Sequence, residues 1–364
     1  MTSDATADGP RLSTTYDDAR SAAHAAARRA DATTTTSVHP STGRDGEELA
    51  IDVVTIGPDD AEAVLVIVSG THGVEGYAGS ALQRWWLDER AHTIPPGVRV
   101  AIVHALNPVG FSWVRRVNED NVDLNRNFVD WTSPPQNDAY GDLADLLVPT
   151  AWDEETQAAT TTALLEIAGD VGFPRFQEII SGGQYDHPTG VFHGGSGPAW
   201  SNRWITERMA NLVGSARRLG VIDVHTGLGP WGHGELISHE SAGDPGYDRG
   251  TAWWGEVRSM ADGESVSAQL SGDWLGAIDG WVPDVEVTAA ALEFGTVDTV
   301  TVLQALRADA WLHAHGDPRG PDGDVIRAQV RAAFADDDPA WLATLVERFD
   351  AVSSAALIAL AAGN

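Results

Sequence analysis

The sequence predicts an α/β fold in which a mixed, largely parallel sheet is sandwiched by helices. Short apolar runs with the length of buried strands recur along the chain, for example at residues 63–68 and 98–106. Helical patterns separate these runs, as at residues 77–89. Strands that alternate with helices are typical of a sheet covered on both faces, so we expect a largely buried sheet.

The elements are expected in the following order. A helix at residues 16–30 has acids at its start and arginines at its end, which complements the helix dipole. The threonine-rich segment 33–48 is expected to be a loop or an irregular lead into the first strand. The expected strands are 48–57, 63–68, 98–106, 219–229 and 287–296. The further expected helices are 77–89, 153–167, 204–219, 300–315 and 324–362.

We find no internal repeat and no linker in the sequence. We therefore expect residues 1–15 to be a disordered N-terminus and residues 16–364 to form a single domain. The glycine-rich tract 181–197 is expected to be a surface loop near a site, because functional residues gather on loops.

Composition excludes several classes of protein. The formal net charge is −30, from 53 acidic and 23 basic residues, and such a surface repels the phosphates of nucleic acids. Cysteine is absent, so any metal must be held by His, Asp or Glu. No apolar run is long enough to span a bilayer. The N-terminus lacks the pattern of a secretory signal, so we expect a cytoplasmic protein without membrane contacts.

Polar residues with catalytic potential follow the expected strands, where open α/β sheets place their ligand crevices. His72 and Glu75 follow the second expected strand, while His225 and Glu293 lie at the ends of the last two. Two histidines and a carboxylate form a common catalytic zinc set, and a further carboxylate such as Glu293 can then transfer protons. Each residue also has a plainer interpretation: the histidines could be hydrogen-bonded core residues, and Glu293 could pair with an arginine.

Four segments in order carry a resemblance: SGTHGVEGYAGS, NPVGFSWVRRVNEDNVDLNRNF, DVHTGLG and ALEFGT. Together they resemble the zinc carboxypeptidase superfamily, the M14-type metallopeptidases, and within it the DUF2817 family most closely. That superfamily also includes the aspartoacylase and succinylglutamate desuccinylase branch. The resemblance extends from about Glu48 to about Ala310 and implies a zinc carboxypeptidase-like fold.

The resemblance also implies roles for individual residues. His72, Glu75 and His225 match the ligands of one zinc ion per chain, and Glu293 matches the general acid/base. Asn125 and Arg126 match the pair that binds the terminal carboxylate of the substrate.

The arginine that stabilises the oxyanion is matched by Arg116, with its neighbour Arg115 as the rival. The tyrosine that closes over the substrate in classical carboxypeptidases has one candidate in its interval, Tyr247. Gln184, Tyr185 and His187 in the glycine-rich tract are candidates for lining the substrate pocket, with a structured surface loop as the alternative.

These implied roles describe a zinc-dependent hydrolase that cleaves an amide bond next to a free carboxylate. The substrate is expected to be a small peptide or an N-acyl amino acid, and an aspartoacylase-type deacylase is the alternative activity. A non-catalytic metal-binding protein is a further alternative, which the presence of Glu293 disfavours. A serine hydrolase is disfavoured because the sequence has no G-x-S-x-G motif.

Overall fold

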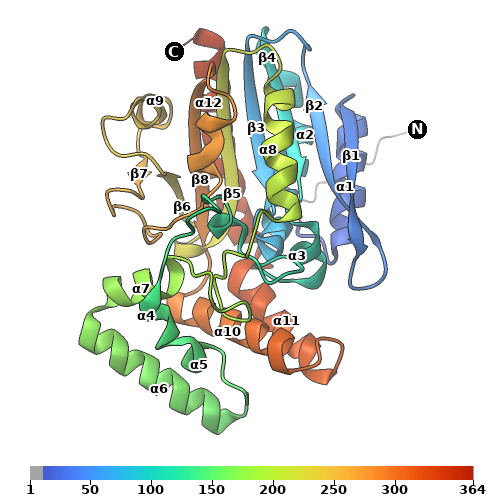
Figure 1. Ribbon diagram of the computed structural model, residues 1–364. Helices are drawn as coiled ribbons and strands as arrows, with labels where there is room; N and C mark the ends of the chain where they lie inside the picture. Colours follow the sequence, from blue (N-terminus) through green and yellow to red (C-terminus); the bar gives the residue numbers. More distant parts are fainter. Residues whose placement is uncertain (1–10, 364) are drawn as a thin grey trace.

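The computed structural model describes residues 11–363, which form one mixed sheet with helices around it (Figure 1). The eight strands of the sheet lie in the order β1-β2-β4-β3-β5-β8-β6-β7. Their bounds are β1 Thr33–Thr42, β2 Glu48–Ile56, β3 Ala63–Ser69, β4 Val98–His104, β5 Arg218–Trp231, β6 Gly234–Ser238, β7 Arg258–Ser259 and β8 Glu286–Gly295.

The middle of the sheet is parallel and its outer parts are mostly antiparallel. Strands β4, β3, β5 and β8 pair in parallel with their neighbours. On one side β1, β2 and β4 pair antiparallel, and on the other β6 is antiparallel to β8 and parallel to β7. This confirms the predicted mixed, largely parallel sheet. It also brings the carboxyl ends of the four central strands to the same edge.

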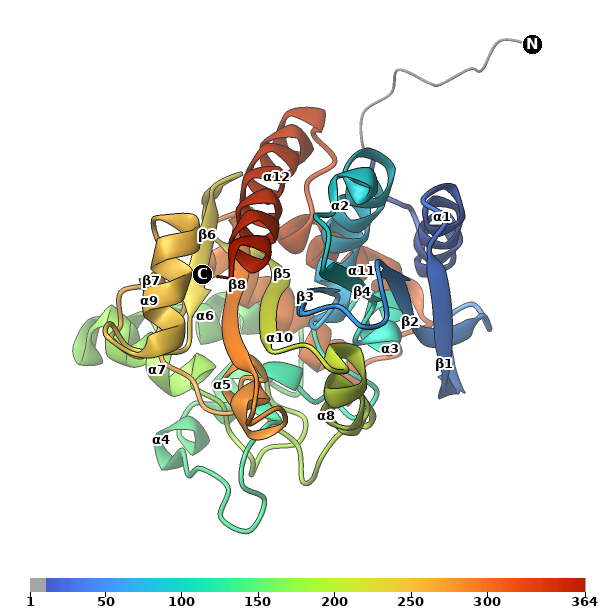
Figure 2. The same cartoon turned by 90° about the horizontal axis from the view of Figure 1, so that it is seen from above.

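Helices cover both faces of the sheet. Figure 2 shows α1, α2 and α12 on one face and α8 on the other, while α4–α7, α10 and α11 lie beyond the carboxyl ends of the strands in Figure 1. The α-helices are α1 Tyr16–Arg29, α2 Gly76–Glu89, α3 Pro108–Trp113, α4 Asp138–Gly141, α5 Ala144–Leu147, α6 Glu154–Val171, α7 Phe173–Ser181, α8 Trp200–Val213, α9 Pro245–Trp254, α10 Thr299–His315, α11 Pro321–Phe334 and α12 Pro339–Ala362. Four 3₁₀ helices complete them: η1 Gly73–Glu75, η2 Ala91–Thr93, η3 Leu124–Arg126 and η4 Leu275–Gly280.

Alternating side chains of the central strands enter two different cores. In β3, Leu65 and Ile67 pack in the core beneath α2 and α12, whereas Val64 and Val66 pack in the core beneath α8. All four are fully buried. A continuous apolar run is therefore needed in this strand, because each face of the sheet is covered.

Some elements differ from the sequence-based expectation. Residues 33–42, expected to be irregular, form the edge strand β1, whose threonines favour extended backbone while most of its side chains stay exposed. The helix expected at 204–219 is α8, which begins at Trp200 and ends at Val213, because Gly214 adopts a positive φ of 63°. The stretch 324–362 contains two helices, with Pro339 starting the second.

Strands β6 and β7 were not predicted. The expected disorder of residues 1–10 lies outside the described residues, whereas Thr15 caps α1 by accepting a hydrogen bond from the Asp18 backbone N–H. Within residues 11–363, no helix combines the length and apolar character needed to cross a membrane.

Candidate metal centre

The loop after β3 carries His72 and Glu75 in a tight bend. Gly70 has a φ of +65°, which favours glycine, and a Cβ on Gly73 would lie 2.0 Å from the carbonyl carbon of Gly110. Only a residue without a side chain lets this loop pass so close to α3. The bend then continues into η1, which turns Glu75 back toward His72.

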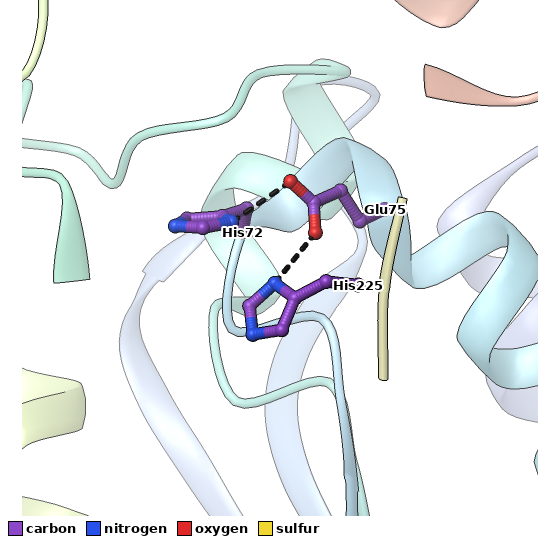
Figure 3. Close-up of side chains that lie close together, drawn as sticks. All are labelled: His72, Glu75 and His225. Carbon is purple, nitrogen blue, oxygen red and sulfur yellow. Dashed lines mark hydrogen bonds and ion pairs between the residues drawn. The ribbon is translucent and has the colours of Figure 1, made fainter. Parts of the chain in front are cut away.

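His72, Glu75 and His225 converge at the carboxyl ends of β3 and β5. The Nδ1 atoms of His72 and His225 each lie 2.8 Å from one carboxylate oxygen of Glu75, as Figure 3 shows. One ligand atom from each residue lies within 4.8 Å of the other two, and all three side chains are buried. The sequence-predicted ligand set is thus assembled in space.

Two further carboxylates hold the outer nitrogens of the histidines. His72 Nε2 lies 3.2 Å from Asp123 Oδ1, and His225 Nε2 lies 2.7 Å from Asp223 Oδ2. Carboxylates in this position fix the tautomer and orientation of a metal-binding histidine, and here they leave both Nδ1 atoms on the side of Glu75. Asp223 also accepts hydrogen bonds from the Thr71 hydroxyl and the Trp274 indole N–H.

Sequence reasoning did not assign roles to Asp123 and Asp223, although a signal was present. Asp223 precedes His225 by two residues in one strand, and residues two apart point to the same face. Asp123 lies two residues before Asn125, within the segment NPVGFSWVRRVNEDNVDLNRNF that carries the family resemblance. For Asp123, only the tertiary structure shows which histidine it contacts.

The buried charges at this centre shift one another's pKa values. Burial alone would raise the pKa of Glu75, but His72 and His225 hold it well below its ordinary value. Burial alone would lower the pKa of His225, yet Asp223 and Glu75 raise it well above the ordinary value. Glu75, Asp123 and Asp223 are the carboxylates that contact the two histidines. Two imidazoles and one carboxylate that converge in a buried position are a donor set that fits Zn²⁺.

Glu293 lies beside His225. The two residues are register partners on the parallel strands β5 and β8, and both line one cavity. Glu293 Oε1 accepts a hydrogen bond of 2.9 Å from the Leu228 backbone N–H. Burial, followed by the negative charge of Glu75, raises the pKa of Glu293 to about 7. A carboxyl group with a pKa in this range can both accept and donate a proton near neutral pH.

The two neighbouring arginines take different positions. Arg116 lines the cavity, and its guanidinium contacts Asp123 at 2.9 Å and Glu75 at 3.2 Å. Arg115 does not line that cavity and instead forms a buried ion pair of 2.9 Å with Asp309. Position therefore favours Arg116 for a role at the site and assigns Arg115 to packing beneath α10.

Asn125 and Arg126 also line the cavity. The Arg126 guanidinium donates to the backbone oxygens of Ser181 and Asn125, which leaves two of its five N–H groups outside these bonds. Phe192 lies beneath both Arg126 and Arg116, with each guanidinium carbon 5.4 Å from the ring centre. Asn125 Oδ1 is buried without a hydrogen-bond partner, so this part of the cavity presents unused polar groups.

The remaining candidates do not line this cavity, which differs from the expectation. The Tyr185 hydroxyl donates to the Arg126 backbone oxygen and thus supports that residue from behind. Gln184 bonds to the backbone of His187, whose ring lies against Tyr140. Tyr247 lies in α9 and donates to the Val257 backbone oxygen. From the glycine-rich tract it is Ser181 and Phe192 that line the cavity.

Among solved structures, an aspartoacylase family protein from Mesorhizobium loti is 18% identical, with a TM-score of 0.39 over 79% of this chain and 68% of that one. Carboxypeptidase A from Helicoverpa armigera is 14% identical, with a TM-score of 0.43 over 88% and 74% of the two chains. Succinylglutamate desuccinylase from Chromobacterium violaceum is 13% identical, with a TM-score of 0.41 over 93% and 73%. A search of curated proteins found no match.

A family model matches most of the chain, from residue 12 to residue 348. The family is described as a protein of unknown function, DUF2817, and this confirms the family that the sequence motifs resembled. The chain belongs to the DUF2817 family.

Proposed function

We propose that this protein is a metal-dependent hydrolase of an amide bond adjacent to a free carboxylate, with Zn²⁺ as its metal. The observation that carries the proposal is the position of Glu293 in register beside His225, next to the cluster of His72, Glu75 and His225. The same order of motifs in the zinc carboxypeptidase superfamily supports this assignment.

His72, Glu75 and His225 would hold the ion, with one Nδ1 from each histidine and the carboxylate of Glu75 as donors. Such an ion activates a water molecule and polarises the substrate carbonyl. Asp123 and Asp223 orient the two imidazoles through their Nε2 atoms, which strengthens the imidazoles as donors.

Glu293 moves the protons in this proposal. Its carboxylate accepts a proton from the attacking water and returns it to the nitrogen of the leaving amine. The Leu228 N–H holds one carboxylate oxygen, which leaves the other oxygen available for this transfer. Burial, the largest cause of the raised pKa of Glu293, favours its protonated form and so helps this residue to act as an acid as well as a base.

The cavity arginines would handle negative charge. Arg116, whose guanidinium contacts Glu75, would stabilise the oxyanion that develops on the scissile carbonyl. Arg126 would bind the free carboxylate of the substrate through the N–H groups left outside its backbone hydrogen bonds, because a guanidinium matches a carboxylate in geometry and charge. Asn125 would donate its side-chain amide N–H to the same carboxylate. The net charge of −30 repels such substrates at long range, so activity on them should rise with moderate salt.

A hydrolysis screen tests the proposal. The zinc-loaded protein is incubated with dipeptides that vary at the C-terminal residue and with N-acyl amino acids, and released amine is measured. Cleavage of free-acid substrates supports the proposal, and the preferred series separates a peptidase from a deacylase. Absence of cleavage across both series, despite stoichiometric zinc, would identify a non-catalytic metal-binding protein.

Metal content tests the ligand assignment separately. We expect about one zinc ion per chain in the wild type and none in the His72→Ala/His225→Ala double variant. Full zinc occupancy in that variant would refute the assignment.

A further inference from the structure

The cavity that contains the candidate metal centre extends between α6, α7 and α10. Its inner end is polar and includes Arg116, Arg126 and Glu293. Its outer walls are apolar, with two residues from each helix as examples: Leu164 and Leu165, Phe173 and Phe176, Val300 and Leu303. One continuous space therefore joins a catalytic set to an apolar chamber.

The mouth of this chamber is also apolar. Leu165, Phe173 and Val300 are 54%, 50% and 42% exposed. They are three of the eight large hydrophobic residues that are exposed within residues 11–363. Isolated exposed apolar side chains are ordinary, but a group of them around a cavity marks a binding surface.

The walls contributed by the three helices carry no charge. Every residue of α6, α7 and α10 that lines the cavity is apolar or an uncharged Ser, Thr or Gln. Charged residues make up 21% of the whole sequence, with acids outnumbering bases by 53 to 23. The charged residues of the cavity, such as Asp273 and Arg126, belong to its other walls. A charged side chain that packs against the three helices has no charged partner in those walls, and burying it there would be costly.

We propose that this chamber binds a large apolar group of the substrate, so that the substrate is an amide with a free carboxylate and an aliphatic or aromatic substituent. This inference rests on the proposed function for the position of the amide. The apolar group is either the acyl part or the side chain of the amino acid, which share the same chemistry. The occupant is part of the substrate because the chamber is continuous with the polar end where the amide is cleaved.

Two substrate series test the proposal and separate its two sources. In the first series, N-acyl glycines with acyl chains from acetyl to decanoyl vary the acyl part. In the second series, the N-acetyl derivatives of Ala, Leu, Phe, Asp and Arg vary the side chain of the amino acid. We expect kcat/KM to rise about three- to fourfold per added methylene in one series, until the chamber is filled. If the amino-acid side chain occupies the chamber, N-acetyl-Asp and N-acetyl-Arg should be the poorest substrates of the second series. A flat response in both series would overturn the proposal.

A binding measurement keeps this test independent of turnover. Aliphatic carboxylates from butyrate to decanoate are titrated into the metal-free protein by calorimetry, and affinity should again rise about three- to fourfold per methylene. Chain-length-dependent binding without any hydrolysis would refute the proposed function but support the chamber. Hydrolysis of small polar substrates at the same rate as large apolar ones would support the proposed function but refute the chamber.

Matched variants locate the binding. Leu165→Asp and Leu303→Asp place a charge on the chamber wall and should weaken decanoate binding at least tenfold. Val325→Asp is the control, since Val325 in α11 is 58% exposed, like Leu165, and does not line the cavity. Leu165 and Val325 are both surface residues, so folding of these two variants is expected to be unaffected. Equal loss of binding in Leu165→Asp and Val325→Asp would contradict the assignment of the chamber.

Discussion

Replacing Glu293 by Gln should abolish turnover and also change the pH dependence of stability. Glutamine can still accept the Leu228 N–H with its side-chain oxygen, so the local structure is kept. It cannot transfer a proton, and loss of a general acid/base lowers turnover by about 10²- to 10⁴-fold. Zinc binding should be retained, because Glu293 is not one of the three proposed ligands.

The effect on stability follows from the pKa of Glu293, which the fold raises from 4.5 to about 7. Between these values the folded protein holds a proton that the unfolded chain has lost. The stabilisation from this group is therefore complete below pH 4.5 and is lost as the pH rises through 7. Each unit of pKa difference corresponds to about 1.4 kcal/mol, so the wild type should lose up to about 3 kcal/mol over this range.

The Gln variant has no such titration. In the metal-free state it should gain up to about 3 kcal/mol relative to the wild type between pH 4.5 and pH 8, measured by urea unfolding. Glu235→Gln is the matched control, because Glu235 faces Glu293 across β6 and β8 and also accepts one backbone N–H, from Val266. Its turnover should be unchanged. Parallel pH profiles for wild type and Glu293→Gln, or retained hydrolysis by Glu293→Gln, would refute the reasoning.

Three other changes have defined outcomes. Arg126→Ala should raise KM for free-acid substrates but leave amidated ones unaffected; equal losses in a steady-state comparison would contradict the carboxylate-binding role. Gly73→Ala should destabilise the protein by about 1–3 kcal/mol and weaken zinc binding in a chelator competition, because the new Cβ would overlap the backbone of Gly110. Gly169→Ala is the control and should be neutral or stabilising, because the space around its Cβ is open. Burial lowers the pKa of His104 from 6.5 to about 4, so between these pH values the folded protein binds fewer protons than the unfolded chain. The free energy of unfolding should therefore fall by up to about 3 kcal/mol as the pH drops from 6.5 to 4. In the His104→Gln variant this loss, measured by thermal unfolding, should be smaller.

The sequence alone predicted the central strands and the residues that gather at their ends. Apolar runs long enough for one strand are a local signal, and polar residues that follow such runs meet at one sheet edge whenever the strands are parallel. That is why His72, Glu75, His225 and Glu293 could be predicted as one group before any contact was known. The edge strand β1 was missed because a polar, exposed strand carries no such signal.

The tertiary structure decided what depends on contacts between distant segments. Arg115 and Arg116 are neighbours in sequence, and only the packing of α10 against one of them separates their roles. Asp123 became a partner of His72 through a contact across 51 positions of the chain. The apolar chamber arises where α6, α7 and α10 face one another, and periodicity within a single helix does not specify the helix opposite it.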